Sequence, residues 1–263
     1  MISCRLAGGL GNMMFQIAAT SSAAWKHRDE PVFYLHENWG MVHKMPHEYQ
    51  DTIFRKIRRS SSPLVMWPLQ EYLDHPYKEL PYTKHTLRNG YFQSEKFFIE
   101  HEEKIHNLFA PRQFDIDHIN TTYGNLLKHP CISIHIRRGD YENLEHNHPI
   151  LPLSYYSKAI DTLPSCEYIL VFSDDMAWCK QNLKDLPYSN KLKFVQDDDF
   201  IELYLMSMCT YNIIANSTFS WWAAWLNKAE DKQVIAPSVW FGPNLSHVDT
   251  KDLLPEGWLI LSI

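Results

Sequence analysis

Short apolar runs alternate with amphipathic segments through the second half of the chain, and this alternation constrains the fold more than any other feature. Each run has the length of a buried strand, and each segment between two runs has the apolar period of a helix. Such alternation predicts a parallel sheet with right-handed crossover connections. The predicted strands are 131–136, 168–175, 192–195, 211–215 and 233–237, and the predicted helices are 152–163, 176–183, 197–209 and 217–227.

The first half of the chain predicts a smaller α/β unit with a less regular pattern. The expected elements are a strand at 2–8, the turn GGLGN at 8–12, a helix with small side chains on one face directly after it, a strand at 31–35, an irregular segment with short helices at 36–90, and a helix at 90–109. We therefore expect an α/β protein of two domains that face each other across a cleft. Their expected bounds are 1–120 and 121–263.

Charge and cysteine content exclude several classes of function. The formal net charge is −6, whereas general nucleic-acid binding requires a basic excess. If the ligand is an anion, local arginines must attract it against this overall field. The cysteines are odd in number and none are at C-x-x-C spacing, so buried reduced thiols are expected rather than disulfides or a zinc site. They are Cys4, Cys131, Cys166, Cys179 and Cys209.

No segment of the sequence has the pattern of a signal peptide or a membrane span. The N-terminal residues enter a predicted strand directly, and the apolar run FSWWAAWL (219–226) is far shorter than the ~20 residues of a spanning helix. We expect a soluble, cytoplasmic protein without an integral membrane segment. Peripheral association with a membrane is left open.

Four motifs fall where predicted strands end. They are GGLGN (8–12), HIRRGDY (135–141), FSDD (172–175) and NSTFSWW (216–222). Ligands of open α/β sheets bind beyond the carboxyl ends of the strands, so the coincidence predicts a ligand site. GGLGN is weak by itself because it matches neither the dinucleotide fingerprint nor the Walker loop. A tight strand-to-helix turn explains it equally well.

The adjacent arginines in HIRRGDY are the most informative pair. Successive residues of a strand point to opposite faces, so one guanidinium can face a ligand while the other braces the loop. The guanidinium fork matches two phosphate oxygens at once. The alternative is an internal ion pair with Asp140 or Glu142. We interpret Arg137, which shares a strand face with His135, as ligand-binding, and both interpretations stay open for Arg138.

The remaining motifs have a structural as well as a functional interpretation. Asp174 and Asp175 could bind a metal, accept the N–H groups of a guanine edge, or cap the next helix, and one of them is expected to be the cap. The acidic run 197–199 opens a predicted helix, where the dipole favours carboxylates, so we do not interpret it as a metal site. The tryptophans after residue 220 have helical spacing and are expected in the core.

A predicted helix (217–227) begins just after the predicted strand at 211–215. Asn216, Ser217 and Thr218 stand at its N-terminus, which suits either a phosphate or an ordinary helix cap.

Taken together, GGLGNMMFQ, GYFQSEKFF, HIRRGDY, FSDD and NSTFSWWAAWL resemble the α-1,2-fucosyltransferase family of glycosyltransferases, from about residue 2 to 240. Met13 and Tyr211 depart from the family's pattern. The resemblance implies a GT-B-like enzyme with two Rossmann-like domains. It also implies inverting transfer of L-fucose from GDP-β-L-fucose to a glycan acceptor, at the 2-hydroxyl of a galactose-type residue, with no cofactor and no metal ion.

The resemblance also implies roles for individual residues. Arg137 would hold the β-phosphate and neutralise the charge that grows on the departing GDP. Independently of the resemblance, the position of Asp140 one short turn beyond the arginines makes it a candidate for the base that takes the acceptor proton, with orientation of Arg138 as the alternative. The other implied donor-binding residues are His135, Asp174 and Asp175 for the guanosine end, Arg138, Asn216, Ser217 and Thr218 for the phosphates, and Gly11 and Asn12 near the fucose and the diphosphate.

Two further interpretations remain. The chain could be a non-catalytic protein that binds nucleotide sugars or glycans on the same fold, because a fold does not determine a function. It could also be a fucosyltransferase that makes another linkage.

Overall fold

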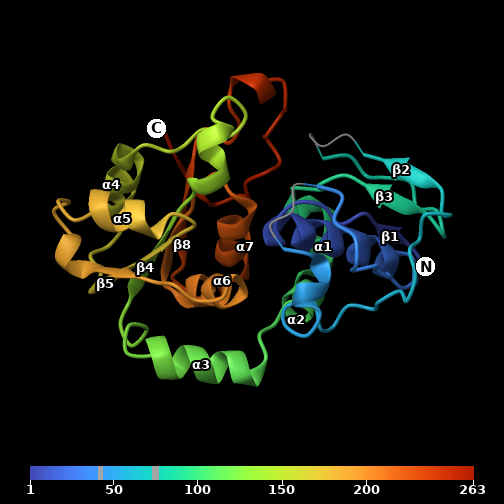
Figure 1. The fold of residues 1–263 in the computed structure, drawn as a ribbon, viewed down its shortest axis with the longest axis horizontal. Helices are drawn as coiled ribbons and strands as arrows, with labels where there is room; N and C mark the ends of the chain where they lie inside the picture. The colour runs from blue at the N-terminus through green and yellow to red at the C-terminus, as the bar shows by residue number, and fades with distance from the viewer. Residues whose placement is uncertain (41–43, 73–76) are drawn as a thin grey trace. The chain divides into compact units, whose positions relative to one another are not determined.

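The computed structural model describes residues 1–40, 44–72 and 77–263. They group into two compact units, drawn together in Figure 1. Unit 1 consists of 1–111 and 248–255, and unit 2 of 112–247 and 256–263. The sequence predicts a division after residue 120. The units divide after residue 111, and a short C-terminal segment returns to unit 1.

Unit 1 is built on a small parallel sheet with the strand order β1-β3-β2. Most residues of its helix α1 (Leu10–Lys26) are buried, and the alanines and serines among them let the helix lie close to its neighbours. The other elements are β1 (Ser3–Cys4), β2 (Leu69–Glu71), β3 (Leu87–Asn89), α2 (Glu102–Leu108), and 3₁₀ turns at Pro46–Tyr49, Glu95–Phe97 and Ile99–His101.

Several predictions for unit 1 are wrong. No strand forms at 31–35, where only two isolated bridges occur, Ile2 to Pro31 and Phe33 to Arg59. Pro31 has no N–H to donate to a ladder, which limits pairing there. Conversely, β2 and β3 lie within 36–90, which the sequence predicts as irregular. The helix predicted at 90–109 is reduced to two 3₁₀ turns followed by α2.

Unit 2 contains a six-stranded, wholly parallel sheet with the order β6-β5-β4-β7-β8-β9. All five strands predicted in this half form, which confirms the α/β class and the parallel sheet. The edge strand β9 and the helix α3 have no counterpart in the prediction. The strands are β4 (Cys131–Ile136), β5 (Tyr168–Ser173), β6 (Leu192–Phe194), β7 (Tyr211–Ile213), β8 (Gln233–Pro237) and β9 (Leu259–Leu261).

The four predicted helices of unit 2 also form, and they cover both faces of the sheet. In Figure 1, α4 and α5 lie on one side of the strands, and α6 and α7 on the other. The isoleucines of β4 pack into the core that includes Tyr155 and Tyr156 of α4. The helices are α3 (Gln113–Tyr123), α4 (Leu153–Thr162), α5 (Met176–Asn182), α6 (Asp199–Met208) and α7 (Thr218–Leu226), with 3₁₀ turns at Gly139–Asn143, Ser189–Lys191 and Pro243–Leu245.

Residue-level predictions about the core are confirmed. Trp221 and Trp222 are fully buried and Trp225 is almost so. All five cysteines are buried free thiols. Within the described part of the chain, no helix is both long enough and apolar enough to cross a membrane.

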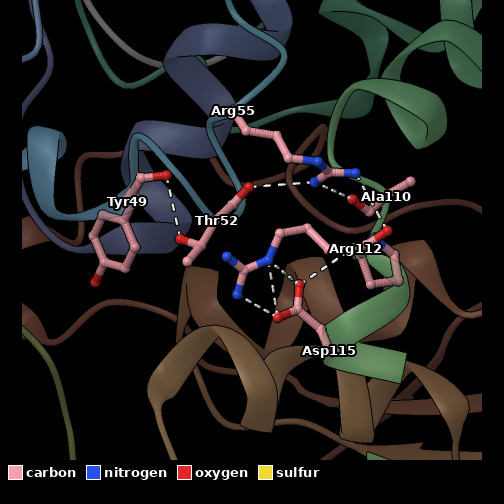
Figure 2. A network of polar contacts seen from close by, with 7 residues as sticks. Tyr49, Thr52, Arg55, Ala110, Arg112 and Asp115 are labelled. Atoms are coloured by element: carbon pink, nitrogen blue, oxygen red, sulfur yellow. Dashed lines mark hydrogen bonds and ion pairs between the residues drawn. The ribbon is translucent and has the colours of Figure 1, made fainter. Parts of the chain in front are cut away.

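Two arginines hold the chain on either side of the junction between Pro111 and Arg112, where the units divide (Figure 2). In unit 1, Arg55 donates to the carbonyl oxygens of Ala110 and Pro111, at 2.6 and 3.3 Å. In unit 2, the Arg112 guanidinium pairs with Asp115, which is 1% exposed, at 2.5 Å. Because Asp115 also accepts from the backbone N–H of Arg112 at 2.9 Å, it caps α3.

Candidate active site

The strand order of unit 2 has a switch point between β4 and β7. The chain runs from β4 outward through β5 to β6, then crosses to β7 on the opposite side of β4. At such a point, the connections leave the carboxyl ends of adjacent strands in opposite directions, so a crevice opens between them, where α/β proteins bind ligands. HIRRGDY follows β4 and NSTFSWW follows β7, so the fold brings these two motifs to the switch point.

Arg137 is the first arginine beyond β4, and two carboxylates hold its guanidinium. Its terminal nitrogen lies 2.8 Å from Asp140, and its Nε lies 3.2 Å from Asp174. The guanidinium carbon is 5.4 Å from the centre of the Tyr141 ring. The side chain retains 19% of its exposure. Arg137 is therefore fixed in orientation but still accessible to an anion.

Asp174 is positioned by the turn that follows β4. One of its oxygens accepts the backbone N–H of Arg138 at 2.9 Å, while the other faces Arg137. A Cβ at Gly139 would lie 2.5 Å from Oδ2 of Asp174, closer than van der Waals contact permits. The absence of a Cβ at Gly139 thus leaves room for this carboxylate in its present position beside the arginine.

Arg138 has the bracing arrangement that the sequence left open. It lies 2.6 Å from Glu142, and its guanidinium stacks 3.9 Å from the centre of the Trp178 ring. Asp175 is also near, with 3.6 Å between its Oδ2 and Nε of Arg138. Asp140, the other acid considered as a partner of Arg138, lies 2.8 Å from Arg137.

Asp175 caps α5, which confirms that one of the two carboxylates of FSDD is a helix cap. Its Oδ1 accepts the backbone N–H of Trp178 at 3.0 Å. Of the pair, Asp174 alone faces Arg137. Both carboxylates already have cationic neighbours, and their remaining lone pairs are available for further donors.

His135 is buried on the side of β4 that faces α7. It is 3% exposed, and its ring lies 5.4 Å from that of Phe219. Its Nδ1 has no hydrogen-bond partner among the described residues. Burial, with the nearby Arg137 guanidinium, lowers the pKa of His135 from 6.5 to about 3. The imidazole is thus neutral at physiological pH and can offer a hydrogen bond but no charge.

The segment after β7 is braced rather than loose. The Nδ2 of Asn216 donates to the carbonyl oxygens of Pro149 and Trp240, at 3.0 and 3.1 Å. The backbone carbonyl oxygen of Asn216 accepts a hydrogen bond from the Tyr141 hydroxyl at 2.9 Å. This bond connects the loops after β4 and β7. The buried side chain of Asn216 is therefore a structural bracket.

Ser217 and Thr218 lie at the start of α7, as predicted. Ser217 is the N-cap residue and makes no side-chain cap hydrogen bond, and Thr218 is the first helical residue. The N–H groups of a first helical turn have no acceptor within the helix. Together with the positive end of the helix dipole, they suit an anion.

In unit 1, the turn GGLGN is fixed by surrounding amides. Gly8 has φ +81°, a conformation that favours glycine. Gln16 accepts the N–H of Ala7 at 2.9 Å and donates to the carbonyl oxygen of Gly90 at 3.1 Å. Asn12 accepts from Gln93 at 3.0 Å. Gly11 is buried in the first turn of α1. The turn thus presents Asn12 in a defined orientation.

Acidic clusters elsewhere have structural roles. Asp198 occupies the N-cap position of α6, without a side-chain cap hydrogen bond, and Asp199 is the first helical residue, where the helix dipole favours a carboxylate. Within the described ranges, no group of three or more His, Cys, Asp or Glu side chains is arranged to hold a metal ion.

Sequence reasoning missed three residues of this site. Gly139 makes room for Asp174, Tyr141 links the two loops, and His148 stacks on Tyr141 at 4.9 Å between ring centres. Burial lowers the pKa of His148 below its usual value. Gly139 and Tyr141 belong to the motif HIRRGDY (135–141), so their place in that motif could have marked them as site residues. His148 follows from no spacing in the sequence.

The arrangement is suited to stabilising negative charge. A preorganised guanidinium, a neutral imidazole and a helix N-terminus meet at one sheet edge. Donors fixed in this way stabilise charge that develops in a reaction without a reorganisation cost.

The chain resembles known glycosyltransferases in sequence and in fold. The model of glycosyl transferase family 11 matches residues 2–260. An α-1,2-colitosyltransferase of Escherichia coli is 30% identical, over 98% of both chains. A galactoside 2-α-L-fucosyltransferase, Sec1 of Mus musculus, is 24% identical over 86% of this chain and 64% of its own length. Among solved structures, the NodZ α-1,6-fucosyltransferase soaked with GDP-fucose matches with a TM-score of 0.57 and 16% identity, over 86% of this chain and 92% of NodZ.

Proposed function

The chain belongs to glycosyl transferase family 11, and from this premise we propose that it transfers L-fucose from GDP-β-L-fucose to the 2-hydroxyl of a galactose-type residue, inverting the anomeric carbon. The observation that carries the proposal is the fixed guanidinium of Arg137 at the switch point of the parallel sheet. The proposal includes a GT-B-like arrangement in which two Rossmann-like domains face a cleft.

In this proposal, Arg137 neutralises the leaving group. The β-phosphate gains negative charge as the bond between the sugar and the phosphate breaks. A guanidinium that Asp140 and Asp174 already hold in place can bind this charge without first being ordered. Since the arginine supplies positive charge, we propose that no metal ion is needed.

The rest of the donor would be bound by the groups around Arg137. We assign phosphate contacts to Ser217 and Thr218 at the start of α7, because the first turn of a helix, with its positive dipole end, suits phosphate oxygens. We assign the guanosine end to His135 and the FSDD carboxylates. In unit 1, Gly11 and Asn12 would contact the sugar.

Asp140 has two candidate roles. A carboxylate 2.8 Å from a guanidinium is a weak base, because the cation stabilises its ionised form. We therefore favour Asp140 as a residue that positions Arg137. Asp140 can act as a general base only if the Arg137 guanidinium turns towards the donor phosphate and its contact with the Asp140 carboxylate breaks.

A second donor is a specific alternative. The α-1,2-colitosyltransferase that resembles this chain along nearly its whole length is named for colitose, a sugar that lacks the 3-hydroxyl of fucose. A site built to hydrogen-bond this hydroxyl would reject colitose strongly, whereas a site without such a partner would discriminate weakly.

The test is a competition between donors. The protein is given equal amounts of GDP-fucose and GDP-colitose with galactose-terminated oligosaccharides. The products differ by one oxygen atom in mass, and NMR of the product identifies the linkage. The proposal predicts mainly fucose in α-1,2 linkage. Mainly colitose would establish the alternative donor, and GDP-fucose binding without acceptor-dependent GDP release would indicate a non-catalytic binding protein.

A further inference from the structure

The loop between β4 and α4 carries a histidine at the same sheet edge as Arg137. His148 follows the 3₁₀ turn Gly139–Asn143 and precedes α4. Its imidazole is half-buried and stacks on the Tyr141 ring, with 4.9 Å between ring centres and 21° between the planes. The Arg137 guanidinium lies 5.4 Å from the centre of the same ring. One tyrosine therefore contacts both this imidazole and the guanidinium that the proposed function assigns to the leaving phosphate.

Backbone contacts on both sides hold this histidine in place. The carbonyl oxygen of the preceding residue, Asn147, accepts the N–H of Gly242, which follows β8, at 2.8 Å. The carbonyl oxygen of the following residue, Pro149, accepts from the side chain of Asn216, which follows β7, at 3.0 Å. The loop that bears His148 is thus fixed to the loops after β7 and β8, at the edge of the sheet where α/β proteins bind ligands.

The ring nitrogens of His148 are not engaged by the protein itself. Neither nitrogen makes a hydrogen bond or an ion pair with a residue that the structure describes. The second ring beside it, Phe241, lies 5.8 Å away between ring centres and has no polar atom in its side chain. By contrast, the ring nitrogens of His101 and His118 have side-chain partners at 2.9 and 2.7 Å. A nitrogen lone pair of His148 is therefore available to a bound molecule.

The surroundings of the imidazole keep it neutral. Burial is the largest effect and lowers the pKa of His148 below 6.5, while the Asp140 carboxylate and the Arg137 guanidinium act on this pKa in opposite directions. The Tyr141 hydroxyl is engaged by a backbone carbonyl oxygen at 2.9 Å, and the loop after β8 contributes the uncharged ring of Phe241. An imidazole in this state is unprotonated at neutral pH and can accept a proton.

The titratable groups closest to Arg137 are poorly suited to this task. Asp140 and Asp174 pair with the guanidinium at 2.8 and 3.2 Å, and a carboxylate beside a cation is a weak base. Asp175 caps α5. The buried His135, with its pKa lowered to about 3, is too weak a base at neutral pH. A hydroxyl that attacks the sugar must nevertheless lose its proton, and a positioned base promotes this loss.

We propose that the imidazole of His148 is the general base of the transfer reaction. The proposal rests on the proposed function, because the acceptor hydroxyl supplies the proton. As the acceptor oxygen bonds to the anomeric carbon, its proton passes to the imidazole lone pair. The bond from that carbon to the phosphate oxygen breaks, and its electron pair leaves with GDP, whose charge Arg137 stabilises. The imidazolium then releases the proton to water.

The matched variants His148→Gln and His146→Gln test this assignment. Both replace a histidine of the same loop, and His146 is exposed. Acceptor-dependent GDP release is followed from pH 4.5 to pH 8, with GDP binding and thermal melts measured in parallel. A general base contributes roughly 10²–10⁴-fold, so kcat of His148→Gln should fall by that factor while its affinity for GDP is unchanged. His146→Gln should transfer like the wild type.

The pH profile separates a proton acceptor from a side chain that only packs. Protonation of His148 removes its lone pair, so the wild-type kcat should fall on acidification through a pKa below 6.5. This fall should be absent in His148→Gln, and imidazole added to the buffer should restore part of the rate of this variant.

The outcomes distinguish this assignment from the proposed function. If His148→Gln transfers as fast as His146→Gln, or if the wild-type kcat stays constant down to pH 4.5, the assignment is overturned and the proposed function stands. If the wild type binds GDP-fucose but releases no GDP when the acceptor is added, the proposed function fails and the assignment fails with it.

Discussion

The Asp174 carboxylate lies 3.2 Å from Nε of Arg137, and its second oxygen accepts the backbone N–H of Arg138 at 2.9 Å. One side chain from the end of β5 thus fixes both the direction of the arginine and the turn after β4. This contact makes the orientation of Arg137 a property of two adjacent strands rather than of a flexible loop.

Gly139→Ala should impair transfer while the fold persists. The new Cβ would lie 2.5 Å from Asp174 Oδ2 and displace the carboxylate from Arg137. A misplaced catalytic group can cost about a hundredfold in rate. Asp174→Asn is the companion variant, since it keeps the shape and removes the charge. Steady-state kinetics with thermal melts measure both. Wild-type turnover in both variants would show that this contact does not matter for the reaction.

Arg138→Ala should lower the free energy of unfolding by about 1–3 kcal/mol, because a stacked and ion-paired side chain is lost from a site that is 15% exposed. Glu142→Gln should cost less, since Glu142 is 48% exposed and such ion pairs contribute at most about 1 kcal/mol. Chemical denaturation of both variants provides the comparison. An unchanged midpoint for Arg138→Ala would contradict its bracing role.

Stability should fall on acidification below pH 6.5 because of His135. Its pKa is lowered from 6.5 to about 3 in the folded chain, chiefly by burial. Between these values the unfolded chain binds the proton and the folded chain does not, so unfolding becomes more favourable as pH falls. From pH 7 to pH 5, this linkage amounts to about 2 kcal/mol.

Denaturation at pH 7 and pH 5 measures the effect, with His135→Asn as the comparison. The variant should lose less stability than the wild type on acidification. Equal losses in the two proteins would mean that His135 is not the responsible group.

The sequence predicted unit 2 well because burial on both faces gives its strands a strong signal. CISIHI (131–136) is wholly buried in β4. In contrast, the prediction missed β9 at Leu259–Leu261, a short edge strand whose side chains are apolar but largely exposed. In unit 1 the strands contain only two or three residues, too few to show a period. The apolar run at 31–35 suggested a strand, but this segment makes only isolated bridges and is not a strand of the sheet in unit 1.

The site was predictable at the level of motifs but not of partners. Parallel strands bring their carboxyl ends to one edge, so the meeting of HIRRGDY, FSDD and NSTFSWW followed from the alternation. Which acid pairs with which arginine depends on the 3₁₀ turn Gly139–Asn143. That turn directs Asp140 to Arg137 and Glu142 to Arg138. Spacing alone allowed either pairing.

Chelation should leave transfer intact. If the Arg137 guanidinium supplies the positive charge at the phosphates, millimolar EDTA should change neither GDP binding nor turnover. The assay compares EDTA-treated protein with the same protein after addition of Mg²⁺ or Mn²⁺. Loss of transfer on chelation with recovery on metal addition would refute the metal-free mechanism and restore Asp174 and Asp175 as candidate ligands.

The central claim is that Arg137 stabilises the departing GDP, and acceptor-dependent fucose transfer by Arg137→Ala tests it most directly. Removal of one preorganised donor typically costs ~2.7–4 kcal/mol, or roughly a hundred- to a thousandfold in rate. We expect kcat to fall by that factor and the affinity for GDP-fucose to fall by less. Arg137→Lys should recover little, because lysine keeps the charge but lacks the fork. Near-wild-type transfer by Arg137→Ala would contradict the account.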